Sequence, residues 1–191
     1  MKKIILENEV VRLKELDQND LDGIFEASQD ELIWKHMTLN IATKVDAVEY
    51  VQNALTNKEH GTEYPFIIID QKTKQIIGST RFLDLHLEHK RLEIGYTWLN
   101  TKYWRTNINS NCKYLLLEYC FENLGLHRVQ LKTDHENLRS QKAIERIGGK
   151  KEGILRNHMI RQDGTARHTV MYSITHEEWP YVKEHLQKLM R

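Results

Sequence analysis

Cysteine is scarce in this sequence, and the two that occur cannot pair with each other. Cys112 and Cys120 stand eight residues apart in a stretch with helical character, which separates them by about 12 Å at a rise of about 1.5 Å per residue. The sequence contains no CxxC pair, no cluster of Cys and His at zinc spacing, and no N-terminal stretch that resembles a signal peptide. We therefore expect a reduced, cytoplasmic protein with no metal site.

Neither sign of charge is in excess. The chain has 28 Lys and Arg residues against 27 Asp and Glu residues, a formal net charge of +1. Such a chain has no long-range field to attract nucleic acid or an anionic membrane, and no apolar run approaches the length of a membrane span. An anionic ligand must therefore be bound by a local arrangement of groups.

Linkers are also lacking, since the chain has only two prolines, no internal repeats and no low-complexity segments. Its 191 residues suffice for one core of ordinary size, whereas two independent domains would each be marginal. We expect a single domain over residues 1–191, with a core at about 10–175.

Hydrophobic periodicity predicts a strand, early helices and a hairpin in the first half of the chain. In order, these are a strand at 10–13, a helix that Asp17 caps and that continues to about 28, a helical stretch near 31–36, a helix that the capping box of Thr43 and Asp46 opens, and a hairpin of strands 66–70 and 76–82.

The second half alternates strands and helices. A strand at 92–99, a helix at 110–124, a strand at 127–133 and a helix at 138–147 precede strands near 153–158 and 169–174 and a last helix that Thr175 and Glu178 open as a capping box. This order predicts an α/β (mixed α+β) fold, with a central, mostly antiparallel sheet and helices on both faces. The strands at 92–99 and 127–133 are the expected parallel pair, and a ligand favours the place where such strands diverge.

The connection between the strand at 92–99 and the helix at 110–124 is polar. Residues 100–110 contain Arg, Thr, Ser and three Asn. Unpaired N–H groups and a partial positive charge at a helix N-terminus bind anions such as pyrophosphate without a metal, and Arg105 would add a charged contact. The alternative is a solvated loop in which Asn109 or Ser110 simply caps the helix.

Four strings that occur in a fixed order carry a resemblance to a known family. They are W-R-T-N-I-N at 104–109, L-G-L-H-R-V at 124–129, N-L-R-S at 137–140 and E-R-I-G-G-K-K-E-G at 145–153. The sequence from Val11 to Tyr172 resembles the GNAT acetyltransferases. Within them it is most similar to the RimJ/RimL-type group, which acetylates N-terminal amines of ribosomal proteins and includes members that act on small amines.

The resemblance implies an N-acetyltransferase that moves acetyl from acetyl-CoA to a primary amine by direct attack in a ternary complex. The residues that it implies for cofactor binding are Trp98, Leu99, Asn100, Trp104, Arg105, Thr106, Asn107, Ile108, Asn109, Ser110, Asn137 and Ser140. In the family, the strand that holds the first three splays from its neighbour so that its backbone pairs with the pantetheine, and the Leu99 N–H is then an oxyanion donor. The expected partners are acetyl-CoA and an amine acceptor, with a homodimer left open and no nucleic acid or membrane.

The sequence departs from the family at its phosphate loop. Three glycine positions of the family hold Arg105, Asn107 and Asn109, and two later positions hold Gly149 in place of Phe and His168 in place of Asp. Asn is the non-glycine residue that best tolerates positive φ, but it brings a side chain into the loop. The alternative that follows from these departures is a degenerate GNAT fold that binds a ligand without catalysis.

Two side chains are the candidates for proton transfer. Ser140 would protonate the departing thiolate, and its alternative role is to pair with the Asn137 cap. Glu93 would take the proton of the incoming ammonium through water, and its alternative is an edge-strand residue in solvent. Strand alternation places Glu93, Gly95 and Thr97 on one face and Ile94, Tyr96 and Trp98 on the other.

The acceptor is expected to be a protein N-terminus, with a polyamine or aminoglycoside as the alternative. The fold places its acceptor groove near residues 34–37, Arg81, Phe82 and the loop 84–91. His86 and His89 in that loop are expected to be solvated rather than metal ligands, because no third ligand stands near them. Tyr172 matches a late tyrosine of the family that packs near the thiol.

Overall fold

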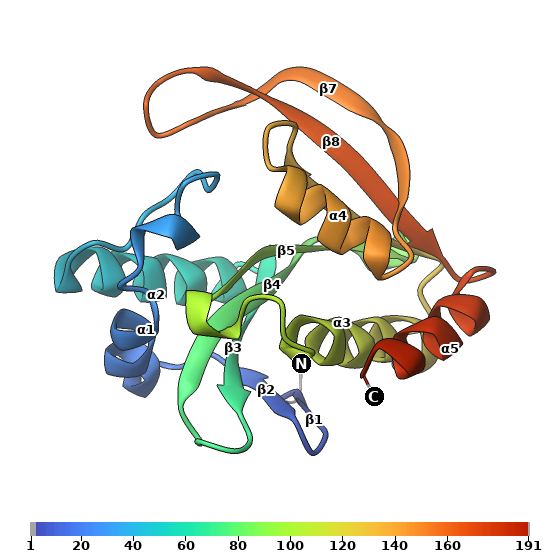
Figure 1. The fold of residues 1–191 in the computed structure, drawn as a ribbon, viewed down its shortest axis with the longest axis horizontal. Coiled ribbons are helices and arrows are strands. Elements are labelled where there is room, and N and C mark those ends of the chain that lie inside the picture. The colour runs from blue at the N-terminus through green and yellow to red at the C-terminus, as the bar shows by residue number, and fades with distance from the viewer. Residues whose placement is uncertain (1–2, 191) are drawn as a thin grey trace.

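The computed structural model describes residues 3–190, which form one eight-stranded sheet flanked by helices (Figure 1). The strand order is β1-β2-β3-β4-β5-β6-β8-β7. The strands are β1 (Ile5–Glu7), β2 (Val11–Glu15), β3 (Glu63–Asp70), β4 (Ile76–His86), β5 (Arg91–Leu99), β6 (Arg128–Asp134), β7 (Lys150–Ile160) and β8 (Ala166–Thr175). Every neighbouring pair is antiparallel except β5 and β6, so the predicted fold class and its parallel pair are confirmed.

Helices cover the two faces of the sheet. They are α1 (Leu21–Ala27), α2 (Lys44–Glu59), α3 (Ile108–Glu118), α4 (Leu138–Arg146) and α5 (Trp179–Met190), with short turns η1 (Gln18–Asp20), η2 (Glu31–Ile33), η3 (Leu87–His89) and η4 (Thr101–Tyr103), and a π-helical extension of α3, η5 (Tyr119–Asn123). Figure 1 shows α1 and α2 grouped on the left and α3, α4 and α5 on the right. No helix within residues 3–190 is long and apolar enough to cross a membrane.

The predicted Asp17 cap and the predicted capping box of Thr43 and Asp46 both form, and Asp17 also forms a capping box. The Asp17 side chain accepts from the backbone of η1 while Asp20 returns a bond to the Asp17 N–H, and Thr43 and Asp46 do the same for α2. At the last predicted box, a Glu178 carboxylate oxygen accepts from the Thr175 N–H at 2.9 Å. These local bonds satisfy N–H groups that a helix start leaves unpaired.

The core divides into two clusters. The larger packs α3, α4 and α5 against the sheet and includes Leu92, Ile94, Leu116 and Tyr172. The smaller packs α1 and α2 against the sheet and is centred on buried aromatic and aliphatic side chains such as Trp34. The sheet therefore separates two layers, and the cavity described below reaches both.

A β-bulge interrupts β5 and reverses the direction of its side chains. Tyr96 has a φ of 47°, and Tyr96 and Thr97 together lie opposite a single residue of β4, Thr80. Ile94 consequently packs in the larger cluster and Trp98 in the smaller one. The simple alternation expected from the sequence, with Ile94 and Trp98 on one face, is wrong, because a bulge inserts one extra residue into the strand.

The parallel pair separates after a short stretch. β5 and β6 pair only from Arg91 to Glu93 of β5 and from Arg128 to Gln130 of β6. The remaining residues of β5, up to Leu99, have no pairing with β6 in this register. The sheet is thus open between these strands, at the place where the sequence predicted a ligand.

Candidate active site

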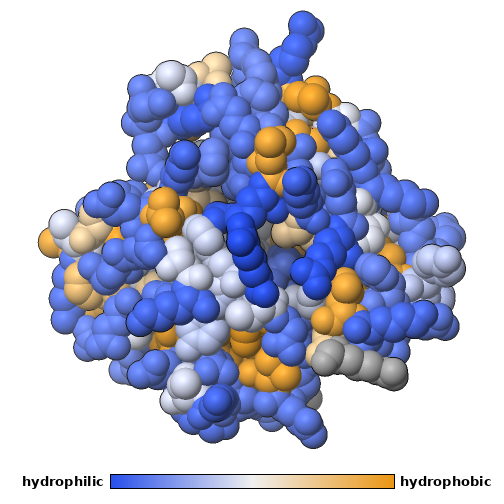
Figure 2. All heavy atoms as spheres, viewed as in Figure 1, coloured by the Kyte–Doolittle hydropathy of each residue, from blue (hydrophilic) through white to orange (hydrophobic). Residues whose placement is uncertain are grey.

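A cavity of about 450 Å³ lies where β5 and β6 diverge and is bounded by the starts of α3 and α4. Its lining contains seven Lys and Arg side chains, namely Arg105, Lys113, Lys132, Arg139, Lys142, Arg146 and Arg167, against a single carboxylate, Glu93. Figure 2 shows a hollow near the centre of the molecule that is bordered largely by hydrophilic residues. A site so rich in cations within a chain of net charge +1 favours an anionic ligand.

The N-terminus of α3 opens on this cavity without a side-chain cap. Its N-cap residue is Asn107, whose side chain makes no capping bond and instead donates to the Met190 carbonyl at 3.3 Å. Asn109 and Ser110, in the first turn, line the cavity. The alternative in which Asn109 or Ser110 caps the helix is therefore wrong, and the uncapped helix start is a potential anion site.

The backbone of the loop before α3 differs from the expectation. Arg105 has a φ of 63°, whereas Asn107 has a φ of −77° and Asn109 lies within the helix. Of the three positions at which the family has glycine, only the first has a left-handed backbone, and in this chain an arginine occupies it. Asparagine therefore does not replace glycine at a positive φ in this loop, because the helix begins at Ile108, two residues before its expected start at 110.

Two arginines face the same mouth of the cavity without a carboxylate partner in residues 3–190. The guanidinium of Arg139 lies 3.3 Å from the centroid of the Trp104 ring. Burial, and then the nearby charge of Arg105, lower the pKa of Arg139. Two cations held together beside a helix N-terminus form an arrangement that a phosphate group would stabilise.

Asn137 and Ser140 stand at the start of α4 and both line the cavity. The Asn137 side chain accepts from the Ser140 N–H at 3.0 Å and so caps the helix. This bond uses the backbone N–H of Ser140. The Ser140 hydroxyl makes no intramolecular hydrogen bond in the described part of the chain. The hydroxyl is thereby available to a ligand.

Glu93 is a buried carboxylate, with only 2% of its surface exposed. One oxygen, Oε2, accepts from Gln130 Nε2 and is paired with Lys132 Nζ, both at 3.1 Å. The other, Oε1, is buried and has no partner among residues 3–190. The alternative of an edge-strand glutamate in solvent is wrong, because β6 covers this end of β5.

The other residues predicted for the cofactor divide into two groups. Trp98, Leu99, Trp104, Arg105 and Thr106 line the cavity with those described above. Asn100, Asn107 and Ile108 do not. Asn100 donates from its side chain to the Ala27 carbonyl, and Ile108 is buried in the larger cluster.

Lys113 is a cavity residue that sequence reasoning missed. It lies on α3 and is 5% exposed, and its Nζ donates to Thr97 Oγ1 at 2.8 Å. Burial lowers its pKa to about 8. The one sign of its burial in the sequence is that Lys113 stands beside an apolar stretch that includes Leu115 and Leu116.

The far end of the cavity is lined by His36, Met37, Thr38, Met159 and Arg167. We call this end the acceptor half. Burial lowers the pKa of His36. The tip of the β7–β8 hairpin closes one side, because Gln162 Nε2 donates to the carbonyls of Met37 (3.0 Å) and Leu39 (2.8 Å).

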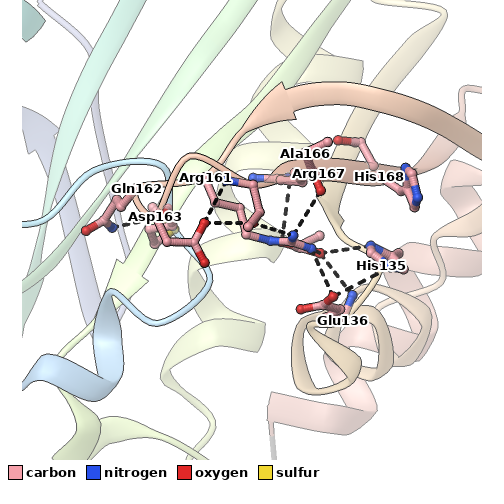
Figure 3. A network of polar contacts seen from close by, with 12 residues as sticks. His135, Glu136, Arg161, Gln162, Asp163, Ala166, Arg167 and His168 are labelled. Atoms are coloured by element: carbon pink, nitrogen blue, oxygen red, sulfur yellow. Dashed lines mark hydrogen bonds and ion pairs between the residues drawn. The ribbon is translucent and has the colours of Figure 1, made fainter.

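An ion-pair network holds this hairpin to the end of β6 (Figure 3). Arg161 donates from Nε and Nη2 to the carboxylate of Asp134 at 2.8 and 3.1 Å. Burial of Asp134 opposes ionisation, but these bonds and the backbone N–H of Glu136 hold its pKa at about 2. The network fixes the position of Arg167, which follows on β8.

Several residues expected near the acceptor, and Tyr172, which was expected near the thiol, lie elsewhere. Arg81 is buried in an ion pair with Glu63, and Phe82 belongs to the larger core cluster. His86 pairs with Asp84 and Glu88 on the surface, and within residues 3–190 no three His, Cys, Asp or Glu side chains gather as a metal site requires. Tyr172 donates its hydroxyl to Glu145 at 3.1 Å and does not line the cavity.

Comparison with known proteins identifies the family. Residues 11–150 match the acetyltransferase (GNAT) domain. The uncharacterized N-acetyltransferase YoaA of Bacillus subtilis is 31% identical over 173 residues, which cover 89% of this chain and 96% of that protein. A GCN5-related N-acetyltransferase from Brucella melitensis has a similar structure, with a TM-score of 0.92, 26% identity, and coverage of 100% of this chain and 87% of its own.

A more distant structure shares the fold. Mycobacterium smegmatis RimJ, solved in complex with CoA-disulfide, has a TM-score of 0.80 at 21% identity, with 97% of this chain and 93% of that chain covered. The family match spans most of the sequence, and the similar proteins have nearly the same length. This chain is therefore an acetyltransferase of the GNAT family.

Proposed function

We propose that this protein transfers acetyl from acetyl-CoA to a primary amine, with the amine bound in the acceptor half of the cavity. One observation carries the proposal: the uncapped N-terminus of α3 opens beside Arg105 and Arg139 on a cavity that begins where β5 leaves β6. A helix start with two free cations fits a pyrophosphate, and an open strand edge fits the amides of pantetheine.

The phosphate end of the ligand would lie at the starts of α3 and α4. Arg105 and Arg139 line the cavity there, Lys142 and Arg146 line it farther along α4, and the cavity lining contains no carboxylate other than Glu93 within residues 3–190. Trp104 would fix the loop, since its Nε1 donates to the Leu99 carbonyl at 2.9 Å. Bound in this way, acetyl-CoA supplies a thioester whose C–S bond breaks as the C–N bond to the amine forms.

The proton transfers fall to residues on opposite sides of the opening. Oε1 of Glu93 accepts the proton of the incoming ammonium, directly or through water, and leaves a neutral amine for attack. The Ser140 hydroxyl gives a proton to the departing thiolate, and it is reprotonated through solvent by the proton that the attacking nitrogen loses as the C–N bond forms. The Leu99 N–H is the proposed donor to the carbonyl oxygen that becomes negative during the reaction.

The acceptor class proposed from the resemblance is a protein N-terminus, as in the RimJ/RimL-type group. In its support, the fold is shared with RimJ and with the ribosomal-protein-S5-alanine acetyltransferase of Vibrio fischeri, the latter at a TM-score of 0.75 and 16% identity. A small amine is the alternative. Within that alternative, the cationic lining disfavours a polyamine or an aminoglycoside. Both cysteines are buried free thiols, which fits the cytoplasmic location proposed from the sequence.

Calorimetry and a thiol-release assay test the proposal. Acetyl-CoA should bind with one site per chain, and free thiol should appear when amines are added. A protein that shows no heat of binding at millimolar acetyl-CoA would exclude the proposed activity. Binding without thiol release from any peptide or small amine would favour the degenerate GNAT fold.

A further inference from the structure

Arg167 is a buried cation of the acceptor half that has no hydrogen-bonded anion within residues 3–190. The residue is 7% exposed, and its guanidinium makes no hydrogen bond within residues 3–190. Its Nε atom is buried without a partner, and the ion pair of that atom with Asp134 Oδ2 spans 4.0 Å. Asp134 is already bound by Arg161 at 2.8 Å. Burial of a guanidinium that lacks a hydrogen-bonded anion is costly, so the position indicates a ligand that provides this anion.

The same cavity contains an unpaired group of the opposite sign. Oε2 of Glu93 is occupied by Gln130 and Lys132, but Oε1 is buried without a partner. Burial lowers the pKa of the Arg167 guanidinium, and the nearby charges of Asp134 and Glu93 act in the opposite direction. Glu93 and Arg167 both line the cavity, so a single ligand that satisfies both groups must carry a cation and an anion.

We infer that the acceptor carries a carboxylate close to the amine that is acetylated, and that Arg167 binds this carboxylate. Glu93 receives the ammonium. The inference rests on the proposed function and adds the chemical class of its acceptor. A planar guanidinium accepts a carboxylate through two parallel hydrogen bonds, which gives both affinity and orientation.

Two sources provide this chemistry. One is a free amino acid, with its carboxylate next to its amine. The other is a peptide whose N-terminal residue is Asp or Glu. A polycation does not provide this chemistry. It has no carboxylate for Arg167, and Lys132 and Arg167 would repel its second amine.

Matched acceptors test the inference in the thiol-release assay with the full chain. Free amino acids are compared with the corresponding amino-acid amides, and hexapeptides that begin with Asp or Glu with those that begin with Asn or Gln. We expect kcat/KM at least about tenfold higher for the member of each productive pair that has the carboxylate, a discrimination that a paired charge readily supplies. A reaction with the amino-acid pair identifies a free amino acid as the acceptor, and a reaction with the hexapeptide pair identifies a peptide N-terminus.

Arg167→Gln should remove this discrimination by lowering the rate with the carboxylate to that with the amide. Arg167→Lys should restore part of it, since the charge remains without the two-pronged geometry. Arg156→Gln is the matched control, because Arg156 is an exposed arginine on the same hairpin, and it should leave the ratio unchanged.

Three outcomes overturn the inference. These are equal use of amides and carboxylates, an equal loss of rate for both members of a pair in Arg167→Gln, and no reaction of any carboxylate-bearing amine although acetyl-CoA binds. Failure of acetyl-CoA to bind at all is a different result, and it excludes the proposed function together with its acceptor.

Discussion

Arg139 and Trp104 are in direct contact, with the guanidinium carbon 3.3 Å from the ring centroid. The indole Nε1 also donates to the carbonyl of Leu99 at the end of β5. The stack thus links the start of α4 to the strand that lines the cavity. A guanidinium held on an aromatic face is positioned before the ligand arrives, which reduces the entropic cost of binding.

Arg139→Gln should weaken acetyl-CoA binding by about tenfold, as expected for loss of one charge-assisted contact to phosphate. Titration calorimetry at low ionic strength measures the dissociation constant. Arg156→Gln removes an exposed arginine and serves as the control. Equal affinity in the wild type and Arg139→Gln would show that the stack has no part in binding the cofactor.

Arg105→Gly should separate stability from binding. The left-handed conformation of Arg105 costs a residue with a side chain about 1 kcal/mol, which glycine avoids, so the free energy of unfolding should rise by about that amount. The affinity for acetyl-CoA should fall, because a cation is lost from the mouth of the cavity. Urea unfolding and calorimetry on the same variant check both signs.

Glycine at 107 and 109 should not strengthen binding. Asn107 has a φ of −77° and Asn109 is helical, so neither position needs the freedom of glycine. The Asn107→Gly/Asn109→Gly variant should bind acetyl-CoA no more tightly than the wild type and should unfold more easily, since glycine in a first helical turn costs about 0.5–1 kcal/mol. A large gain in affinity would contradict this account of the loop.

Lys113 should make stability depend on pH in the alkaline range. Burial lowers its native pKa to about 8 from 10.5. Below pH 8 the Lys113 amine is protonated in both the native and the unfolded state, and the native state bears the full cost of a buried charge. Between these two pKa values the native state loses the proton first, so stability rises with pH.

Lys113→Met should therefore stabilise the protein by about 3 kcal/mol at pH 7 and by only about 1 kcal/mol at pH 10. Urea unfolding at both values measures the difference. Lys151→Met, at an exposed position of β7, is the control and should show no such dependence. A gain that is the same at both pH values would mean that Lys113 is not a buried charge in the native state.

The order of elements could be predicted from local patterns, and its failures have local causes. Capping residues such as Asp17 and Thr43 act over three residues, so their helices follow directly from the sequence. β1 was missed because three residues are too few to show alternation. The bulge at Tyr96 was missed because it depends on pairing with β4, which no single segment encodes.

The site was predictable where a motif specifies it and not where the fold assembles it. Asn137 and Ser140 belong to one string and line the cavity as expected. Lys113, Arg139 and Arg167 come from three elements, and only the packed sheet brings them to one space. The burial of Lys113 and Arg167, which sets these two residues apart from ordinary surface cations, is a property of the tertiary structure.

Glu93 is central to the proposed acetyl transfer, because its unpaired Oε1 lies at the opening between β5 and β6 and accepts the proton of the amine. The most direct measurement is the single-turnover rate of acetyl transfer from bound acetyl-CoA, with acetylated product identified by mass, in the wild type and in Glu93→Gln. We predict transfer in the wild type and a decrease of about 10²–10⁴-fold in the variant, with acetyl-CoA binding retained. Undiminished transfer by Glu93→Gln, or no acetylated product from a wild type that binds acetyl-CoA, would contradict it.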